Sequence, residues 1–226
     1  MQIADSVALV TGAGRGLGQV FVQELARRGA KTVYAAARNP ARLGGPGTPG
    51  IPVELDITKP DQVTAAADRC ADVNLLINNA GVMTSSPFLE APTMDGARQE
   101  IETNYLGTLA MCRAFAPVLA RGGGGAIVNL LSVTSFFTNP ENGSYGASKA
   151  AEWSLTNGVR IELARGLPKL DPLDVVRQVF DAVEANRVEV LAGERTRRVK
   201  SLLPDDHEKI YPAIQATWDA NHPRAT

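Results

Sequence analysis

VALVTGAGRGLG, residues 7–18, carries the strongest structural signal in this 226-residue chain. A short apolar run leads directly into a turn with glycines at 12, 14, 16 and 18, and an amphipathic segment follows. Gly12, Gly16 and Gly18 allow a tight turn and a close approach of the backbone to a pyrophosphate, and the helix that follows presents free N–H groups to that anion. The stretch therefore predicts a strand, a phosphate-binding turn and a helix rather than an ordinary glycine-rich turn.

Strand and helix patterns alternate on either side of this turn. Short apolar, β-branched runs are typical of strands buried on both faces of a parallel sheet, and the alanine-rich segments between them are typical of helices. This alternation predicts an α/β fold with a doubly wound parallel sheet of the Rossmann type, and one dinucleotide-binding domain over residues 1–226. The expected strands are Val7–Val10, Thr32–Ala36, Ile51–Leu55, Asn74–Ile77, Ala126–Leu131 and Val188–Ala192, and the expected helices cover 16–28, 60–70, 94–120, 145–164, 172–185, 194–203 and 206–221.

Composition and charge narrow the possible functions. Lys and Arg total 23 against 24 Asp and Glu, so a net charge of −1 favours neither a nucleic-acid nor an anionic-membrane partner. The two histidines, His207 and His222, lie near the C-terminus, and Cys70 and Cys112 lie far apart, so we expect no metal site and two reduced, structural thiols. No apolar run approaches about 18 residues and no signal-peptide pattern is present. We expect a cytoplasmic chain without a membrane span.

Further motifs follow the glycine turn in order. LDIT at 55–58 follows the third expected strand, NNAG at 78–81 follows the fourth, and a set of four polar residues comes later. Together they make residues 5–165 similar to the classical short-chain dehydrogenase/reductase family. The resemblance implies an oxidoreductase with a nicotinamide cofactor, in which NNAG supports the sheet beside the cofactor and the acid of LDIT contacts the adenine. The implied cofactor-binding residues are Thr11, Gly12, Gly14, Arg15, Gly16, Leu17, Gly18, Arg38, Asp56, Ile57, Asn79, Ala80, Gly81, Tyr145 and Lys149.

Asn104, Ser132, Tyr145 and Lys149 match the catalytic tetrad of that family in order and approximate spacing. Tyr145 and Lys149 are four residues apart on an expected helix, so their side chains are neighbours. A phenol donates a proton poorly at neutral pH, but a nearby ammonium stabilises the phenolate, and Tyr145 would then act as a general acid toward a carbonyl. By resemblance, Lys149 also binds the nicotinamide ribose, Ser132 orients the carbonyl oxygen, and Asn104 helps to hold a water for proton relay. Taken singly, each has a plainer interpretation, such as a helix cap for Ser132.

The end of the second expected strand bears on the choice of cofactor. Family members that prefer NAD usually carry an acid there, whereas YAAAR, residues 34–38, has Ala at that point and Arg38 next to it. Arg15 in the glycine turn adds a second cation. Because guanidinium groups bind phosphate well, the pair predicts NADP(H) in preference to NAD(H), against the alternative of two solvated surface charges.

The chain departs from the family after the expected helix at 145–164. Family members continue into a sixth strand, a Pro-Gly motif and a flexible substrate loop, but here Arg165 leads into GLPKLDP, residues 166–172, with neither strand nor Pro-Gly. A five-residue connector spans at most about 17 Å, so it crosses a sheet only when fully extended. Two explanations stay open: a segment not included between Arg165 and Gly166, which we favour, or a true deletion that leaves the nicotinamide half-site incomplete.

The first hypothesis is an enzyme that transfers hydride between NADP(H) and a small carbonyl compound or secondary alcohol. The alternative is a non-catalytic NADP(H)-binding sensor or scaffold, which explains an incomplete nicotinamide site but not a preserved tetrad. An epimerase or dehydratase fits less well, because those relatives carry a larger C-terminal substrate domain. The resemblance also implies a homodimer or homotetramer built on the two long helices, with Phe115, Trp153 and Leu155 either on that interface or in the core.

Overall fold

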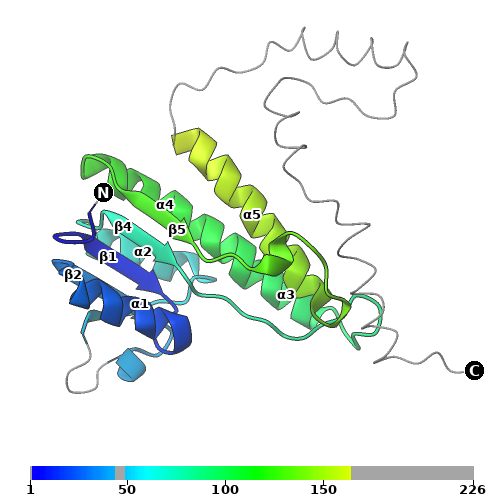
Figure 1. The fold of residues 1–226 in the computed structure, drawn as a ribbon. Coiled ribbons are helices and arrows are strands. Elements are labelled where there is room, and N and C mark those ends of the chain that lie inside the picture. Colours follow the sequence, from blue (N-terminus) through cyan, green and yellow to red (C-terminus); the bar gives the residue numbers. More distant parts are fainter. Residues whose placement is uncertain (1, 44–48, 164–226) are drawn as a thin grey trace, which may run out of the picture. The chain divides into compact units, whose positions relative to one another are not determined.

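A parallel sheet forms the centre of the computed structural model, which describes residues 2–43 and 49–163 (Figure 1). Within these residues the strand order is β3-β2-β1-β4-β5, and every pairing is parallel. The order reverses between β1 and β4, which is the switch point where ligands bind in open α/β sheets. The predicted α/β, doubly wound fold is confirmed. The strands are β1 (Val7–Thr11), β2 (Thr32–Ala37), β3 (Ile51–Glu54), β4 (Leu75–Asn78) and β5 (Ala126–Asn129).

Helices connect successive strands, as the right-handed crossover of parallel strands requires. The longest is α5, which follows β5 and is drawn in yellow-green in Figure 1. The α-helices are α1 (Gly16–Arg27), α2 (Pro60–Arg69), α3 (Asp95–Glu100), α4 (Thr108–Arg121) and α5 (Gly143–Leu163). The π-helix η2 covers Ile101–Gly107, and short 3₁₀ turns lie at η1 (Pro40–Leu43), η3 (Val133–Ser135) and η4 (Pro140–Asn142).

Both faces of the sheet are covered by helices. Successive side chains of a strand point to opposite faces, so Leu9 and Val10 of β1 enter different cores. Leu9 packs in a cluster with α2 and α4 that includes the fully buried Phe115. Val10 packs in a second cluster with α1, which contributes Val22. The near-continuous burial of β1 and β4 explains why their sequences lack a polar alternation.

Two predicted elements differ from the structure. The single helix expected over 94–120 is divided into α3, the π-helix η2 and α4. The wider π-turn coincides with Asn104, whose side chain leaves the helix to bind backbone groups of Val82. The last strand ends at Asn129 rather than at Leu131, and the carbonyl of Leu130 turns to a side chain of α5 instead.

Several predictions fall after Leu163 and lie outside the described residues. These are the helices and the strand expected between 172 and 221, and the missing sixth strand and substrate loop after Arg165. Among the helices that are described, none is both long and apolar enough to cross a membrane.

Candidate active site

The glycine turn is tied to the end of the neighbouring strand by one buried hydroxyl. The Thr11 Oγ1 atom accepts hydrogen bonds from the backbone N–H groups of Asn79 and Ala80, both at 3.0 Å. The Asn79 side chain returns the contact, since its Nδ2 donates to the Thr11 carbonyl at 2.9 Å. Thr11 is 1% exposed, so its side chain positions the turn and does not form a wall of the cavity beside it.

Two glycines of the turn are required by close packing. Gly12 has a φ of +66°, and a Cβ added to it would lie 2.8 Å from the Ala80 Cα. A Cβ on Gly18 would lie only 2.2 Å from the Gly12 carbonyl oxygen. Helix α1 begins at Gly16, and Arg15 at its N-cap provides no side-chain hydrogen bond. The first N–H groups of α1 are therefore available to an anion, and no acidic side chain in the first turn opposes one.

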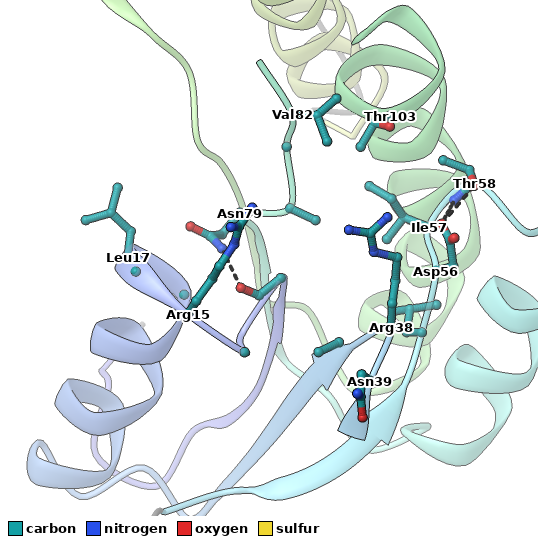
Figure 2. Close-up of a pocket in the computed structure, with 18 of the residues that line it drawn as sticks. Arg15, Leu17, Arg38, Asn39, Asp56, Ile57, Thr58, Asn79, Val82 and Thr103 are labelled. Atoms are coloured by element: carbon teal, nitrogen blue, oxygen red, sulfur yellow. Dashed lines mark hydrogen bonds between the residues drawn. The ribbon is translucent and has the colours of Figure 1, made fainter. Parts of the chain in front are cut away.

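A cavity of about 740 Å³ opens beside this turn (Figure 2). Its walls come from the glycine turn, from the ends of β2, β3 and β4, and from α3 and η2. Its volume falls in the range of cofactor sites. The predicted cofactor residues that line it are Gly12, Gly14, Arg15, Gly16, Leu17, Gly18, Arg38, Asp56, Ile57, Asn79, Ala80 and Gly81.

Sequence reasoning missed part of the lining. Gln99, Glu102 and Thr103 of α3 and η2 line the same cavity, as do Asn39 and Thr58. Asn39 and Thr58 directly follow predicted residues, so adjacency was a usable signal. Gln99, Glu102 and Thr103 lie on a helical segment. The sequence predicts that segment between two strands but does not indicate which end of it faces the cavity.

Charges of both signs face this cavity. Figure 2 shows Arg38 beside Asp56 and Ile57. Partial burial of Asp56 acts to raise its pKa, but hydrogen bonds from the Thr58 N–H and hydroxyl, together with the Arg38 charge, outweigh burial and lower it. Asp56 is therefore a carboxylate at neutral pH, with one oxygen occupied by Thr58. Arg15 lines the cavity from the glycine turn.

Asn104 is fully buried at the back of this cavity. Its Oδ1 accepts from the Val82 N–H at 2.8 Å, and its Nδ2 donates to the Val82 carbonyl at 2.9 Å. The same Nδ2 donates to the Ser148 hydroxyl of α5 at 2.9 Å. The side chain thus joins η2, the segment after β4, and α5. Three hydrogen bonds to protein groups therefore occupy most of the capacity of the Asn104 amide.

Lys149 is buried and doubly hydrogen bonded. Its Nζ donates to the Leu130 carbonyl at 2.7 Å and forms an ion pair with Glu152 Oε2 at 2.6 Å. A Cβ on Gly81 would lie 3.7 Å from this Nζ, so the ammonium lies against backbone that lines the cavity. Sequence reasoning missed Glu152; the signal for it was an acid three residues after the lysine on a helix.

Ser132 and Tyr145 come from elements that pack on each other. Ser132 caps the turn η3, and its Oγ accepts from the Thr134 N–H at 3.2 Å and from the Thr134 hydroxyl at 2.9 Å. Because both bonds are accepted, the Ser132 proton stays available for donation. Phe136 after η3 meets Trp153 of α5 edge to face at 5.5 Å, which holds this turn on the helix that carries Tyr145.

A glycine turn at the switch point of a parallel sheet, with a cavity of this size beside it, defines a Rossmann-type nucleotide-binding protein. Residues 6–166 match the family described as short chain dehydrogenase. The chain belongs to this short-chain dehydrogenase family and is an oxidoreductase of that type. Among the described residues no group of three His, Cys, Asp or Glu could hold a metal ion.

Relatives with solved structures or curated descriptions illustrate the range of the family. A short chain dehydrogenase from Burkholderia cenocepacia, solved in complex with NADP, is 39% identical with a TM-score of 0.74, over 95% of this chain and 99% of that one. The sorbitol dehydrogenase of Cereibacter sphaeroides is 32% identical over 222 residues, 90% of this chain and 85% of its own. A 7α-hydroxysteroid dehydrogenase complexed with NADH is 27% identical with a TM-score of 0.65, over 72% and 67%.

Proposed function

We propose that this protein transfers hydride between NADP(H) and a small carbonyl compound or secondary alcohol, with Tyr145 as general acid or base. One observation carries the proposal. Gly81 lines the cavity beside the glycine turn, and the Lys149 ammonium and the Asn104 amide lie directly behind it. Two members of the predicted tetrad therefore lie close to a residue of the nucleotide-binding cavity.

The residues around the cavity fit a dinucleotide. The uncapped start of α1 and the turn at Gly12 suit a pyrophosphate, because backbone N–H groups there have no side-chain partner. Asp56, ionised and on the rim formed by the end of β3, suits the adenine end of the cofactor. The predicted residues Ile57, Asn79 and Ala80 complete the walls. When bound, the nicotinamide supplies or accepts the hydride.

The tetrad residues then have distinct tasks. Tyr145 moves the proton at the substrate oxygen, and Ser132 donates a hydrogen bond to the same oxygen with the hydroxyl proton that Thr134 leaves free. Lys149 contributes its charge and a hydrogen bond to the ribose. Asn104 keeps η2 and α5 in register with the segment after β4, and helps to hold a water for proton relay.

A preference for NADP(H) is supported by two arginines that line the cavity. Arg38 and Arg15 both line it, and no acid stands at the end of β2, where Ala37 precedes Arg38. A 2′-phosphate gains charge-assisted hydrogen bonds from guanidinium groups that a ribose hydroxyl does not. The relatives named above include one solved with NADP and one solved with NADH, so it is these side chains that support the preference.

The substitution Tyr145→Phe tests the catalytic assignment. It removes the proton donor and keeps the ring, so kcat for a ketone substrate should fall about 10²–10⁴-fold. The Kd of NADPH should change by less than about threefold, because the cavity walls are intact. Retained turnover in this variant would refute the role of Tyr145.

A broad panel of ketones, aldehydes and quinones distinguishes the proposal from a non-catalytic NADP(H)-binding module. Steady oxidation of NADPH with any of them supports the enzyme. Tight NADPH binding without oxidation by any of them favours the module. The relatives named above are dehydrogenases, which gives no support to the module.

The assembly and location proposed here rest on the two long helices and on the thiols. A groove between α4 and α5 is lined by Tyr105, Leu109 and Leu155, and we place a homodimer or homotetramer contact there. Light scattering that gives a monomer at micromolar concentration would refute it. Phe115 is fully buried in the core, so it is not part of that surface.

Cys70 and Cys112 are free and buried, which fits a cytoplasmic enzyme.

A further inference from the structure

The buried face of α5 carries an acid that the tetrad does not account for. Glu152 is 1% exposed, and it lies one helical turn beyond Lys149, which is 5% exposed. Tyr145, Lys149 and Glu152 are spaced by four and three residues, so they follow one face of the helix. A carboxylate in the interior is costly unless it is paired and hydrogen bonded.

The partners of this pair come from two other elements. Glu152 Oε2 takes the ion pair with Lys149 at 2.6 Å, and its Oε1 accepts from the Thr108 hydroxyl of α4 at 3.4 Å. The Lys149 Nζ also donates to the Leu130 carbonyl just after β5, at 2.7 Å. The Glu152 carboxylate therefore links the Lys149 ammonium to α4, while the Leu130 carbonyl just after β5 binds the same ammonium.

The N–H groups of the Lys149 ammonium exceed the number of partners described above. An ammonium has three N–H groups. Leu130 and Glu152 take two of them, which leaves the third for a further partner, and Gly81, which lines the cavity, lies close to the ammonium. A flexible four-carbon side chain acquires in this way one defined position and one defined free donor.

We propose that Glu152 is a positioning residue of the catalytic site: its carboxylate holds the Lys149 ammonium in place and in its charged form, with the third N–H directed to the cofactor and Tyr145. The inference rests on the proposed function, because it assumes that Lys149 acts on both. Glu152 itself touches neither cofactor nor substrate.

Among the described residues, few titratable groups face the ion pair of Lys149 and Glu152. Tyr145 lies on the same helix, and Cys112 faces the pair from α4. Burial, with the Glu152 charge as a smaller contribution, raises the pKa of the Cys112 thiol to about 11, so it is uncharged near neutral pH. Thr108, Leu130 and Gly81 contribute neutral groups. Burial also raises the pKa of Glu152, against the opposing effect of the Lys149 charge.

Removal of the Glu152 carboxylate should therefore change the pH dependence of activity in a defined direction. Burial penalises an unpaired ammonium, so the loss of the Glu152 charge disfavours the charged form of the lysine in the variant. The active form, with a charged lysine, is then present at low pH and is lost as pH rises. A purely structural role for Glu152 lowers activity equally at every pH.

The substitution Glu152→Gln tests this, because it keeps the shape and a hydrogen-bond acceptor while it removes the charge. Wild type and variant are compared from about pH 6 to pH 9 by kcat and by the Kd of NADPH from fluorescence titration. The expected result is a variant whose kcat, relative to wild type, falls further as the pH rises from about 6 to about 9, with NADPH binding weakened in the same direction. Asp68→Asn, which makes the same acid-to-amide change at an exposed position of α2, is the control and should follow the wild type.

Superimposable pH profiles of Glu152→Gln and wild type, in both kcat and Kd, would overturn the proposal. If Glu152→Gln does not fold, Glu152→Asp carries the test, because it keeps the charge but withdraws it by one methylene. It should lower kcat at least about fivefold with an unchanged KM and pH profile, and a wild-type kcat would overturn the proposal. A wild-type chain without turnover would refute the proposed function instead, and the pH dependence of the NADPH Kd would still judge Glu152.

Discussion

The glycine turn and the inner face of α5 are two parts of the proposed site, and they differ in the origin of their binding groups. The turn acts through backbone N–H groups and the absence of side chains, all within residues 11–18. The α5 face acts through buried polar side chains whose partners are the Leu130 carbonyl, Thr108 of α4 and Asn104 of η2. One end is thus encoded in a contiguous stretch, and the other is assembled from several elements.

This difference has an energetic consequence. In the turn, an added methyl group collides with backbone, and backbone has little freedom to move. On the α5 face, a removed side chain leaves buried polar groups without partners, and each such group costs free energy. The first end is therefore sensitive to additions, and the second to deletions. Substitutions in the two regions test that contrast.

Gly18→Ala should have the largest effect. Its Cβ would lie 2.2 Å from the Gly12 carbonyl oxygen and 2.6 Å from Asn79 Nδ2, so the turn and the end of β4 have to move apart. We expect a loss of at least about 3 kcal/mol in the free energy of unfolding, measured with urea, and no detectable binding of NADPH.

Gly16→Ala is the matched control in the same turn. Gly16 has a φ of +54°, but a Cβ there meets nothing within 4 Å, so only backbone strain of about 1–2 kcal/mol is expected. Equal losses for Gly16→Ala and Gly18→Ala would contradict the packing argument.

Asn104→Ala should break the α5 end by deletion. It removes three hydrogen bonds and leaves the Val82 N–H and carbonyl without a side-chain partner in the interior. The expected loss in the free energy of unfolding is about 2–3 kcal/mol, again from urea denaturation. Asn157→Ala, near the surface of α5, is the control and should cost less than about 0.5 kcal/mol. A loss for Asn104→Ala no greater than that of the control would show that the amide does not join these segments.

Arg38→Ala should have the smallest effect on folding and a selective effect on binding. Without the guanidinium, the affinity for NADPH should fall about tenfold, or about 1.4 kcal/mol, while that for NADH stays within about twofold. Fluorescence titration with both cofactors measures the ratio, and the free energy of unfolding should be unchanged. An equal loss for both cofactors would show that Arg38 does not contact a 2′-phosphate.

Much of the fold could be predicted from short stretches of sequence. β1 and α1 follow from residues 7–28 because apolar runs, glycines and helical periodicity act between near neighbours. The π-helical stretch η2 could not be predicted, because Asn104 within it binds Val82, 22 residues away. The end of β5 was misplaced for the same kind of reason, since Leu130 binds Lys149, 19 residues away.

The class of fold, the glycine turn and the tetrad candidates could be inferred from the sequence, because each is carried by a local pattern or by residue types at set spacings. The proximity of Lys149 to Gly81 in the cavity wall, and the ion pair of its ammonium with Glu152, became evident only from the folded chain. The physical reason is range. Hydrophobic periodicity and turn chemistry act over a few residues, whereas the pairing of a buried charge depends on which distant segments exclude water around it.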